Sequence, residues 1–258
     1  MSFAHLRSIL VTAPLMALST AVMATISVTA SLFDSTGHAP HRVARAWARM
    51  LLVIFRVKVT IEGIEKLRPD SSYVFASNHM SYVDTPVILA SIPEQFRFLA
   101  KESLFKIPFL GHHMKRAGYI SVPHDDPRPS VRVMTSIRVL AAAARMVRDR
   151  NVSVLVFPEG ERTNGTLQEF KEGAAYIAIK SGAPIVPLAL QGTHEILAVH
   201  TAVIRGGPVR LTVGDPIPAQ GLTLKDRGRL TATVRERIAG MLGATHSGPE
   251  GAPAVPPA

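Results

Sequence analysis

The chain has 258 residues, enough for one sizeable core, so its length predicts one main domain with appendages rather than two equal domains. With 29 Lys and Arg against 19 Asp and Glu, the net charge is +10, and a surface this basic attracts phosphate groups. An aromatic content of 6% favours a membrane over nucleic acid as the partner, and the absence of cysteine excludes disulfides, thiolate zinc sites and a cysteine nucleophile.

An uncharged stretch runs from Ser8 to Phe33 and exceeds the ~20 apolar residues that span a bilayer. Several Ser and Thr residues dilute it, and Pro14 is expected to kink a helix there. A cleaved signal peptide is the alternative, with small residues around Ala24 and Ala30. Because the run is long for a signal peptide, we favour a retained anchor.

A second membrane-seeking segment runs from His41 to about Val57 and is amphipathic. Its arginines fall three, four and seven residues apart, on one helical stripe opposite an apolar face with one tryptophan: Arg42, Arg45, Arg49 and Arg56. We interpret it as a basic helix in the headgroup layer, and residues 1–56 as a membrane anchor plus this interfacial helix. The alternative is an ordinary amphipathic helix packed on the domain. The basic flank predicts a cytoplasmic location for the domain that follows.

Residues 57–246 carry the pattern of an α/β domain. Strand-like runs occur at Val57–Glu62, Tyr73–Ser77, Phe96–Ala100, Tyr119–Val122, Val152–Phe157, Pro184–Leu190 and Val209–Val213. Helical patterns occur at Tyr82–Ala90, Ser130–Arg148, Glu172–Lys180 and Leu224–Met241, and residues 102–111 are rich in turn formers. This alternation predicts a mostly parallel or mixed sheet flanked by helices, with ligands bound beyond the strand ends. Residues 247–258, dominated by Pro, Gly and Ala, are predicted to be a disordered tail.

A histidine and an aspartate five residues apart follow the second predicted strand, in the run Asn78-His79-Met80-Ser81-Tyr82-Val83-Asp84. Positions five apart on a helix point in different directions, so we expect His79 in a turn and Asp84 in the first turn of the next helix, facing back. A carboxylate on the far nitrogen of a histidine fixes its tautomer and stabilises the imidazolium, so the pair suits deprotonation of a hydroxyl. The alternative is a surface histidine beside a helix-capping aspartate.

Two further polar clusters also follow predicted strands. One begins at Lys101 and continues through Gly118-Tyr119-Ile120 to His124. The other contains Phe157-Pro158-Glu159-Gly160-Glu161-Arg162-Thr163 and, a little later, Lys171. Gly160 allows close backbone approach or a positive φ, Arg162 offers a fork of donors matched to phosphate, and Lys171 adds a second positive charge. The alternative for this cluster is a strand-ending turn with a Glu159–Arg162 surface pair.

In this order and at these separations, the clusters resemble the glycerolipid acyltransferase family over roughly residues 40–220. Asn78-His79-x-Ser81-x-x-Asp84 matches the first motif of the family, the HX4D motif. Phe157-Pro158-Glu159-Gly160-x-Arg162 matches the third, with Glu161 in place of the usual threonine, and Ile185-Val186-Pro187 matches the fourth, which the family associates with acyl-chain or donor binding. The second is partial, because His124 stands where the family usually has a phosphate-binding arginine.

The resemblance implies roles for these residues. His79 would be the general base on the free hydroxyl of a lysophospholipid, with Asp84 orienting it, and the hydroxyl would attack the thioester of acyl-CoA or acyl-carrier protein. No covalent acyl-enzyme, metal or cofactor is required. Arg162 would bind the acceptor phosphate on a loop shaped by Glu159 and Gly160. Lys101 and Arg128 would compensate for the missing arginine at His124, which itself would bind phosphate better when protonated.

The function that follows is acylation of 1-acyl-glycerol-3-phosphate to phosphatidic acid, in phospholipid biosynthesis at the inner or cytoplasmic membrane, with the domain facing the cytoplasm. The bilayer is the expected partner, and no nucleic acid is expected. Three alternatives remain open: another lysolipid acceptor, such as an amino-acid-containing one; an inactive lipid-binding protein; and a metal-dependent hydrolase using His79, Asp84, His112 and His113. The last is weak because His112-His113 lacks a helical ligand spacing, and we expect these two histidines in a solvated or headgroup-facing turn.

Overall fold

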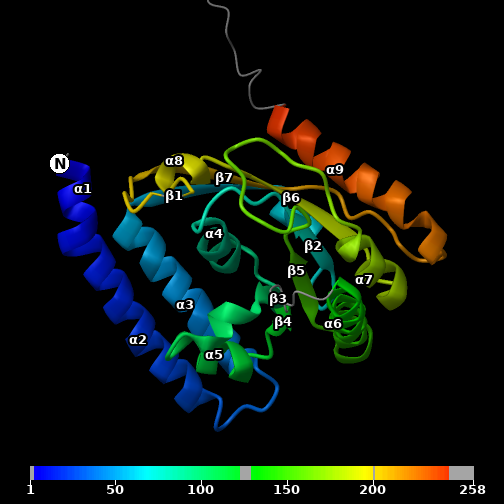
Figure 1. Cartoon of the computed structure of the whole chain (residues 1–258), viewed down its shortest axis with the longest axis horizontal. Helices are drawn as coiled ribbons and strands as arrows, with labels where there is room; N and C mark the ends of the chain where they lie inside the picture. Colours follow the sequence, from blue (N-terminus) through cyan, green and yellow to red (C-terminus); the bar gives the residue numbers. More distant parts are fainter. Residues whose placement is uncertain (1–2, 123–128, 200, 244–258) are drawn as a thin grey trace, which may run out of the picture.

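A sheet flanked by helices forms the centre of the computed structural model, which describes residues 3–122, 129–199 and 201–243 (Figure 1). The strands are β1 (Val57–Glu62), β2 (Val74–Ser77), β3 (Phe96–Lys101), β4 (Ile120–Val122), β5 (Ser153–Val156), β6 (Ile185–Gln191) and β7 (Gly207–Val213). The helices are α1 (Phe3–Arg7), α2 (Ala13–Ala30), α3 (His38–Phe55), α4 (Asp84–Ser91), α5 (Leu110–Arg116), α6 (Pro129–Arg150), α7 (Gly173–Ser181), α8 (Thr193–Ile196) and α9 (Arg227–Gly243). A π-helical turn, η1 (Ser8–Thr12), joins α1 to α2, and 3-10 turns are η2 (Ile64–Lys66), η3 (Glu102–Lys106) and η4 (Leu224–Asp226).

The strand order is β1-β7-β6-β2-β5-β3-β4, and the sheet is mixed, as the sequence predicts. The five strands from β6 to β4 run parallel, whereas β7 is antiparallel to β6 and β1 is parallel to β7. The carboxyl ends of β2, β5 and β3 therefore meet at one edge of the sheet. Each of the three polar clusters found in the sequence begins at one of these ends, which is where an open α/β sheet builds its sites.

Each face of the sheet is covered by its own helices. One core joins α3 and α4 to side chains such as Phe75, Phe96 and Leu188, and the other joins α6, α7 and α9 to Val74, Val154 and Ile185. Alternate residues of a strand point to opposite faces, and both faces of the central strands are apolar, so these strands are nearly continuous hydrophobic runs.

The N-terminal helix exposes large apolar side chains and buries several hydroxyl side chains, which is the reverse of a helix in a protein core. Its lipid-like stripe faces outward, with Val11, Leu15, Leu18, Val22 and Ile26 all at least 45% exposed. Four of its hydroxyl residues face the protein and are buried: Ser8, Thr12, Ser19 and Ser27. Small and hydroxyl residues at helix contacts and apolar residues outside are typical of helices in lipid. Part of the Ser and Thr content that dilutes the hydropathy therefore lies on the inner face of this helix, whereas Thr25 and Thr29 are exposed and bond to carbonyls of their own helix.

Residues Ala4–Ala30 form one continuous helical path of 27 residues, and an 18-residue window within it has a mean hydropathy of 2.0, so by length and composition it suffices to cross a membrane. Pro14 falls in the first turn of α2, directly after the π-helical turn η1, so the helix continues through it. Because proline lacks an N–H, one bond to the preceding turn is missing, and the π-helical turn η1 lies at that place.

The arrangement of α3 corrects part of our interpretation of this helix. Its apolar face is buried in the core formed with α4, through residues that include Ala48, Leu51 and Phe55. Arg42 and Arg49 are exposed on the other side. The apolar face of α3 therefore packs on the domain, which is the alternative that we weighed, and is not inserted among lipid headgroups. The anchor role of residues 1–56 stays a prediction.

The turn-rich residues 102–111 and the two histidines after them also differ from expectation. They form η3 and α5, and α5 packs against α2. His112 is exposed, but His113 is buried and its Nδ1 lies 2.6 Å from Oγ of Ser27. The prediction of a solvated turn was thus wrong for His113. His124, Arg128 and the predicted tail at 247–258 lie outside the described residues.

Candidate active site

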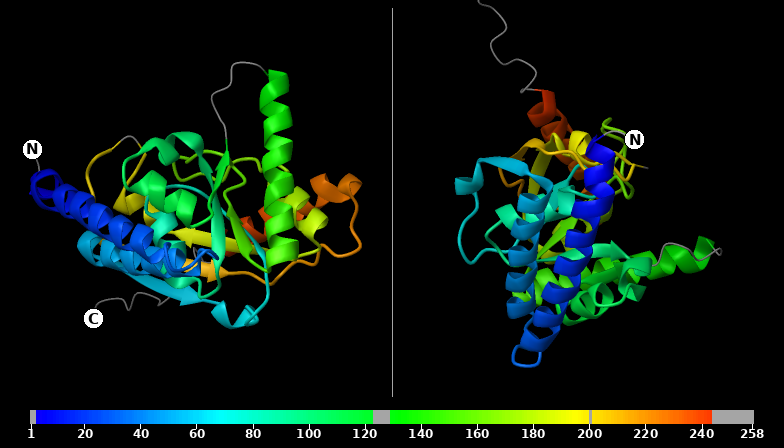
Figure 2. Two further views of the ribbon diagram at one scale, coloured as in Figure 1. Left: turned by 90° about the horizontal axis from the view of Figure 1, so that it is seen from below. Right: turned by 90° about the vertical axis from the view of Figure 1, so that its left-hand side faces the viewer.

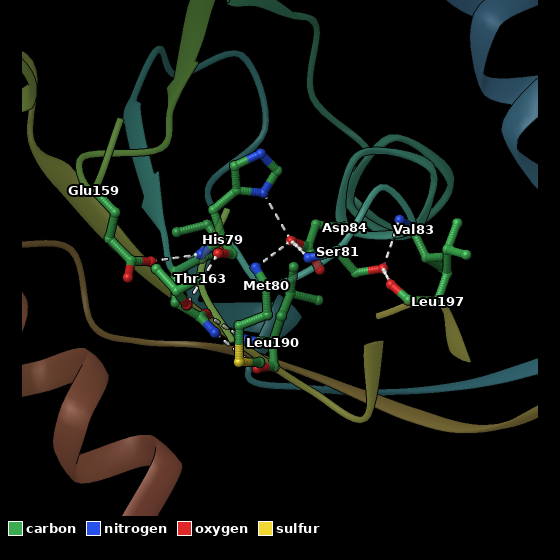
Figure 3. A network of polar contacts seen from close by, with 11 residues as sticks. His79, Met80, Ser81, Val83, Asp84, Glu159, Thr163, Leu190 and Leu197 are labelled. Atoms are coloured by element: carbon green, nitrogen blue, oxygen red, sulfur yellow. Dashed lines mark hydrogen bonds and ion pairs between the residues drawn. The ribbon is translucent and has the colours of Figure 1, made fainter. Parts of the chain in front are cut away.

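His79 and Asp84 form a close buried pair at the carboxyl end of β2. Nδ1 of His79 lies 2.8 Å from Oδ2 of Asp84, and the histidine is in the turn while Asp84 is the first residue of α4, as predicted (Figure 3). The same carboxylate oxygen accepts the backbone N–H groups of Met80 and Ser81 at 2.7 and 2.8 Å. An ionised carboxylate can only accept, so Nδ1 of His79 is the donor and its Nε2 carries the lone pair.

The neighbouring residues of the turn fix it to the rest of the domain. The side-chain amide of Asn78 pairs with the backbone of Leu190 on β6, donating to its carbonyl at 2.9 Å and accepting its N–H at 2.8 Å. Ser81 donates to the carbonyl of Leu197 at 2.7 Å. Both side chains are buried. The turn is thus held from two directions, which pre-organises the His79 side chain.

Glu159 links the turn after β2 to the turn after β5. It is 5% exposed, and its two carboxylate oxygens accept the backbone N–H groups of His79 at 2.7 Å and of Gln168 at 2.9 Å. The carbonyl of His79 in turn accepts the N–H of Thr163 at 2.9 Å. Burial raises the pKa of Glu159, and the two N–H donors oppose that shift. Glu159 therefore acts on His79 through the backbone. This buried carboxylate does not form the surface ion pair with Arg162 that we weighed as an alternative.

An aromatic ring supports the imidazole. The ring of Phe157 stacks on that of His79, with centroids 3.9 Å apart and planes inclined by 17°. Stacking on one face and the Asp84 bond at Nδ1 together restrict the ring to one orientation, with Nε2 as the free edge.

Two cations lie on the turn after β5. The guanidinium carbon of Arg162 is 3.7 Å from the centroid of the Tyr82 ring, and no carboxylate among the described residues pairs with it. Its Nε is buried without a partner in the described chain, so the fork retains donors for an anion. Gly160 has φ +84°, and a Cβ there would collide with Nζ of Lys171. The positive φ favours glycine at this position, and the ammonium group of Lys171 lies close against it.

The remaining predicted residues lie around this pair of turns. Lys101 ends β3, which is the neighbour of β5 in the sheet, and Lys101 is exposed. The Ile185–Pro187 stretch belongs to the buried strand β6 beside β2. The structure therefore brings His79, Asp84, Glu159, Gly160, Arg162 and Lys171 together at the ends of two adjacent strands. It does not address His124.

The arrangement combines a base and a cation. An oriented imidazole with a free Nε2 can take a proton from a hydroxyl, and a neighbouring guanidinium can hold a phosphate. Within the described residues no three His, Asp or Glu side chains gather as metal ligands would. His113, one residue of the metal-hydrolase alternative, is instead committed to Ser27 on α2.

Comparison with known proteins places this fold and site in one class. The acyltransferase family model matches residues 58–191, just over half of the chain. An uncharacterized acyltransferase of Schizosaccharomyces pombe is 31% identical over 214 residues, covering 82% of this chain and 75% of that protein. The chain therefore belongs to the acyltransferase family.

Two further relatives carry more specific names. The chloroplastic 1-acyl-sn-glycerol-3-phosphate acyltransferase BAT2 of Brassica napus is 34% identical over 180 residues, covering 69% of this chain, which spans about half the length of that relative. The crystal structure of the 1-acyl-sn-glycerophosphate acyltransferase PlsC from Thermotoga maritima has a TM-score of 0.73 at 23% identity, covering 92% of this chain and 97% of that one. This second likeness shows that the two chains share a fold.

Some residues of the site escaped the sequence reasoning. The ring of Tyr82 under Arg162 and the ring of Phe157 on His79 lie within the motifs, but no spacing rule reports which aromatic ring will meet which partner. Gln168 contributes only a backbone N–H to Glu159, for which side-chain identity carries no signal.

Proposed function

We propose that this protein transfers a fatty acyl group from acyl-CoA or acyl-carrier protein to the free hydroxyl of 1-acyl-glycerol-3-phosphate, giving phosphatidic acid. The observation that carries the proposal is the buried His79–Asp84 pair with Arg162 on the adjoining turn. The Brassica napus relative, which is named for this reaction, supports the choice of acceptor.

In the proposed reaction, Nε2 of His79 takes the proton of the acceptor hydroxyl while its oxygen attacks the thioester carbonyl. Asp84 stabilises the imidazolium that forms. The tetrahedral intermediate collapses with cleavage of the C–S bond, and the imidazolium returns the proton to the departing thiolate. No covalent enzyme intermediate is needed, in keeping with a chain that contains no cysteine.

Arg162 would hold the acceptor phosphate, with Lys171 and Lys101 adding positive charge at the same sheet edge. The outward apolar face of α2 supports a seat on the membrane, from which the enzyme would take its lysolipid laterally. We place the domain on the cytoplasmic side, where soluble thioester donors are found. His124 and Glu161, which is exposed next to Arg162, favour as a second candidate an acceptor with a different headgroup.

The test is an assay of the full chain in vesicles with lysophosphatidate, lysophosphatidylethanolamine, lysophosphatidylglycerol and an amino-acid-containing lysolipid, each with both thioester donors. We expect phosphatidate from lysophosphatidate, and an Arg162→Gln variant with a raised KM for that acceptor. The matched Arg148→Gln variant removes an exposed arginine at the far end of α6 and should behave as wild type. Turnover of only a different acceptor would refute the phosphatidate assignment while leaving the family intact.

A further inference from the structure

The 3-10 turn η3 and the turn between it and α5 expose three apolar side chains on the active-site edge of the sheet. Leu104, Ile107 and Phe109 are 38%, 44% and 54% exposed. They follow directly on β3, whose carboxyl end lies at the same edge as those of β2 and β5. Three large apolar side chains within six positions form a patch of the kind that marks an interaction surface. We call Leu104, Ile107 and Phe109 the η3 patch.

The backbone adopts a strained conformation at this patch. Phe109 has φ +61° and ψ −57°, and the N–H of Leu110 donates to the carbonyl of Pro108 at 2.7 Å, which is a strained γ-turn centred on a phenylalanine. Gly111 packs so closely on the carbonyl of Phe105 that a Cβ there would collide with it. A bulky residue at positive φ costs of order 1–3 kcal/mol and persists where it serves a purpose. Here the strained residue is also the most exposed of the three.

The helix that follows the η3 patch packs against the N-terminal helix. α5 packs against α2, and His113 is hydrogen-bonded to Ser27 on that helix (Figure 1). The hairpin after α2 adds Leu32 and Phe33, which are 65% and 88% exposed. Two views at right angles show these N-terminal helices along one flank of the domain (Figure 2). Because Ser27 comes shortly before Leu32 and Phe33 and His113 comes shortly after Phe109, both groups of exposed apolar side chains lie near the C-terminal end of α2.

Cations flank the patch. Lys106, Lys115 and Arg116 are exposed on η3 and in the last turn of α5. Lys106 lies 3.4 Å from Glu102 in an exposed pair, and such pairs form and break readily in water. Apolar side chains with basic neighbours match the interface of a bilayer that carries anionic lipid.

We propose that the η3 patch is a second membrane-contact element, which inserts Ile107 and Phe109 into the headgroup–acyl boundary of a lipid surface. Together with α2 it seats the carboxyl edge of the sheet, and so His79, against the bilayer. The occupant is a lipid surface rather than a protein, because the patch lies near the end of α2, which belongs to a helix with the length and composition to cross a membrane and exposes large apolar side chains. The inference goes beyond acyl transfer, since insertion can be measured without turnover.

The test uses a tryptophan at the patch and vesicles of equal parts phosphatidylethanolamine and phosphatidylglycerol with brominated acyl chains, which quench indole on contact. The full chain carries Trp47→Phe, which removes the one native tryptophan, and Phe109→Trp. The matched control is Ile61→Trp on β1, a half-exposed position on the strand at the opposite end of the strand order from β3 and β4.

We expect Phe109→Trp to lose most of its emission and shift to the blue on brominated vesicles, whereas Ile61→Trp keeps its emission. Because α2 can hold both variants on the vesicle, the comparison reports on the patch alone. Equal quenching at the two positions, or none at Phe109→Trp, would overturn the proposal. This readout stands even if no acceptor is turned over, so it fails separately from the proposed function.

A second variant, Phe109→Gly, guards against misfolding as an explanation. Glycine adopts the positive φ without strain, so we expect a melting temperature equal to or above that of wild type. Losing the ring should reduce the rate on lysophosphatidate embedded in vesicles about tenfold, and leave the rate on a short-chain, water-soluble acceptor unchanged. An equal loss on both acceptors would contradict a membrane role.

Discussion

Replacing Asp84 by asparagine separates the charge of this residue from its geometry. Oδ2 accepts three donors, from His79, Met80 and Ser81, at 2.7 to 2.8 Å. Two of these are backbone N–H groups that cannot turn away. An asparagine must therefore place its carbonyl oxygen at the Oδ2 position and its NH2 at the Oδ1 position, which is buried without a partner in the described chain. His79 would keep its Nδ1–H bond and its free Nε2.

The expected loss is that of a charge-assisted bond replaced by a neutral one. A hydrogen bond to a charged group contributes about 1.5–3 kcal/mol and a neutral one about 0.5–1.5 kcal/mol. The difference, together with weaker stabilisation of the imidazolium, predicts a fall in kcat of about 10- to 100-fold with KM little changed. Where the same substitution in a hydrolase triad reverses the histidine tautomer, the loss is about 10⁴-fold. The two outcomes are well separated.

The assay is the initial rate of phosphatidate formation from lysophosphatidate and acyl-CoA, with circular dichroism and the melting temperature as checks on folding. Asp215→Asn is the matched control, because Asp215 is largely exposed and pairs only with Lys66 on the surface. A loss near 10⁴-fold in a well-folded Asp84→Asn protein would show that the backbone does not orient the amide. Wild-type activity would show that the charge has no role.

Three further predictions concern residues around the pair. Glu159→Gln places an NH2 group opposite one of the two backbone N–H donors that the carboxylate now accepts. We expect the free energy of unfolding to fall by about 1–3 kcal/mol and kcat to decrease, as measured by the melting temperature and the initial rate. Normal values for both would contradict the link through the backbone. Asn78→Ala leaves the N–H and carbonyl of Leu190 unpaired in the core. We expect the free energy of unfolding, measured with urea in detergent, to fall by about 2 kcal/mol or more. A change near zero would show that Asn78 does not fix the turn to β6. Burial, with Arg97 and Arg45 nearby, lowers the pKa of His41 to about 3, so below pH 6.5 the unfolded chain gains a proton that the native protein does not. Stability should thus fall by about 2 kcal/mol from this residue between pH 7 and pH 5, and His41→Phe should remove that part of the slope; an unchanged slope would count against it.

Much of the fold was predictable because strand and helix periods differ. The edge strand Val57–Glu62 has the predicted bounds, and the Phe96–Ala100 strand and the long helix after residue 129 were located to within two residues. The reversed direction of β1 and β7 was not predictable, since a side-chain period of two is the same in either direction. The sequence also could not distinguish our two interpretations of α3, because an amphipathic pattern does not say whether the apolar face meets lipid or protein.

Within the site, the His79–Asp84 geometry followed from the spacing, because a turn residue and the first residue of a helix can face each other. The buried state of Glu159 did not follow. A carboxylate in a turn is usually solvated, and here two backbone donors from different segments hold it inside. Such long-range contacts depend on which strands are neighbours, which local sequence does not encode. The roles of the substrate-binding residues, His124 among them, stay predictions.

The most direct measurement of the central claim is acyl transfer by a His79→Gln variant reconstituted in vesicles with lysophosphatidate and acyl-CoA. Glutamine can retain a hydrogen bond to Asp84 but cannot accept the hydroxyl proton as a base. The proposed mechanism predicts loss of nearly all phosphatidate formation with a normal melting temperature. Phosphatidate formation at a rate near that of wild type would contradict it.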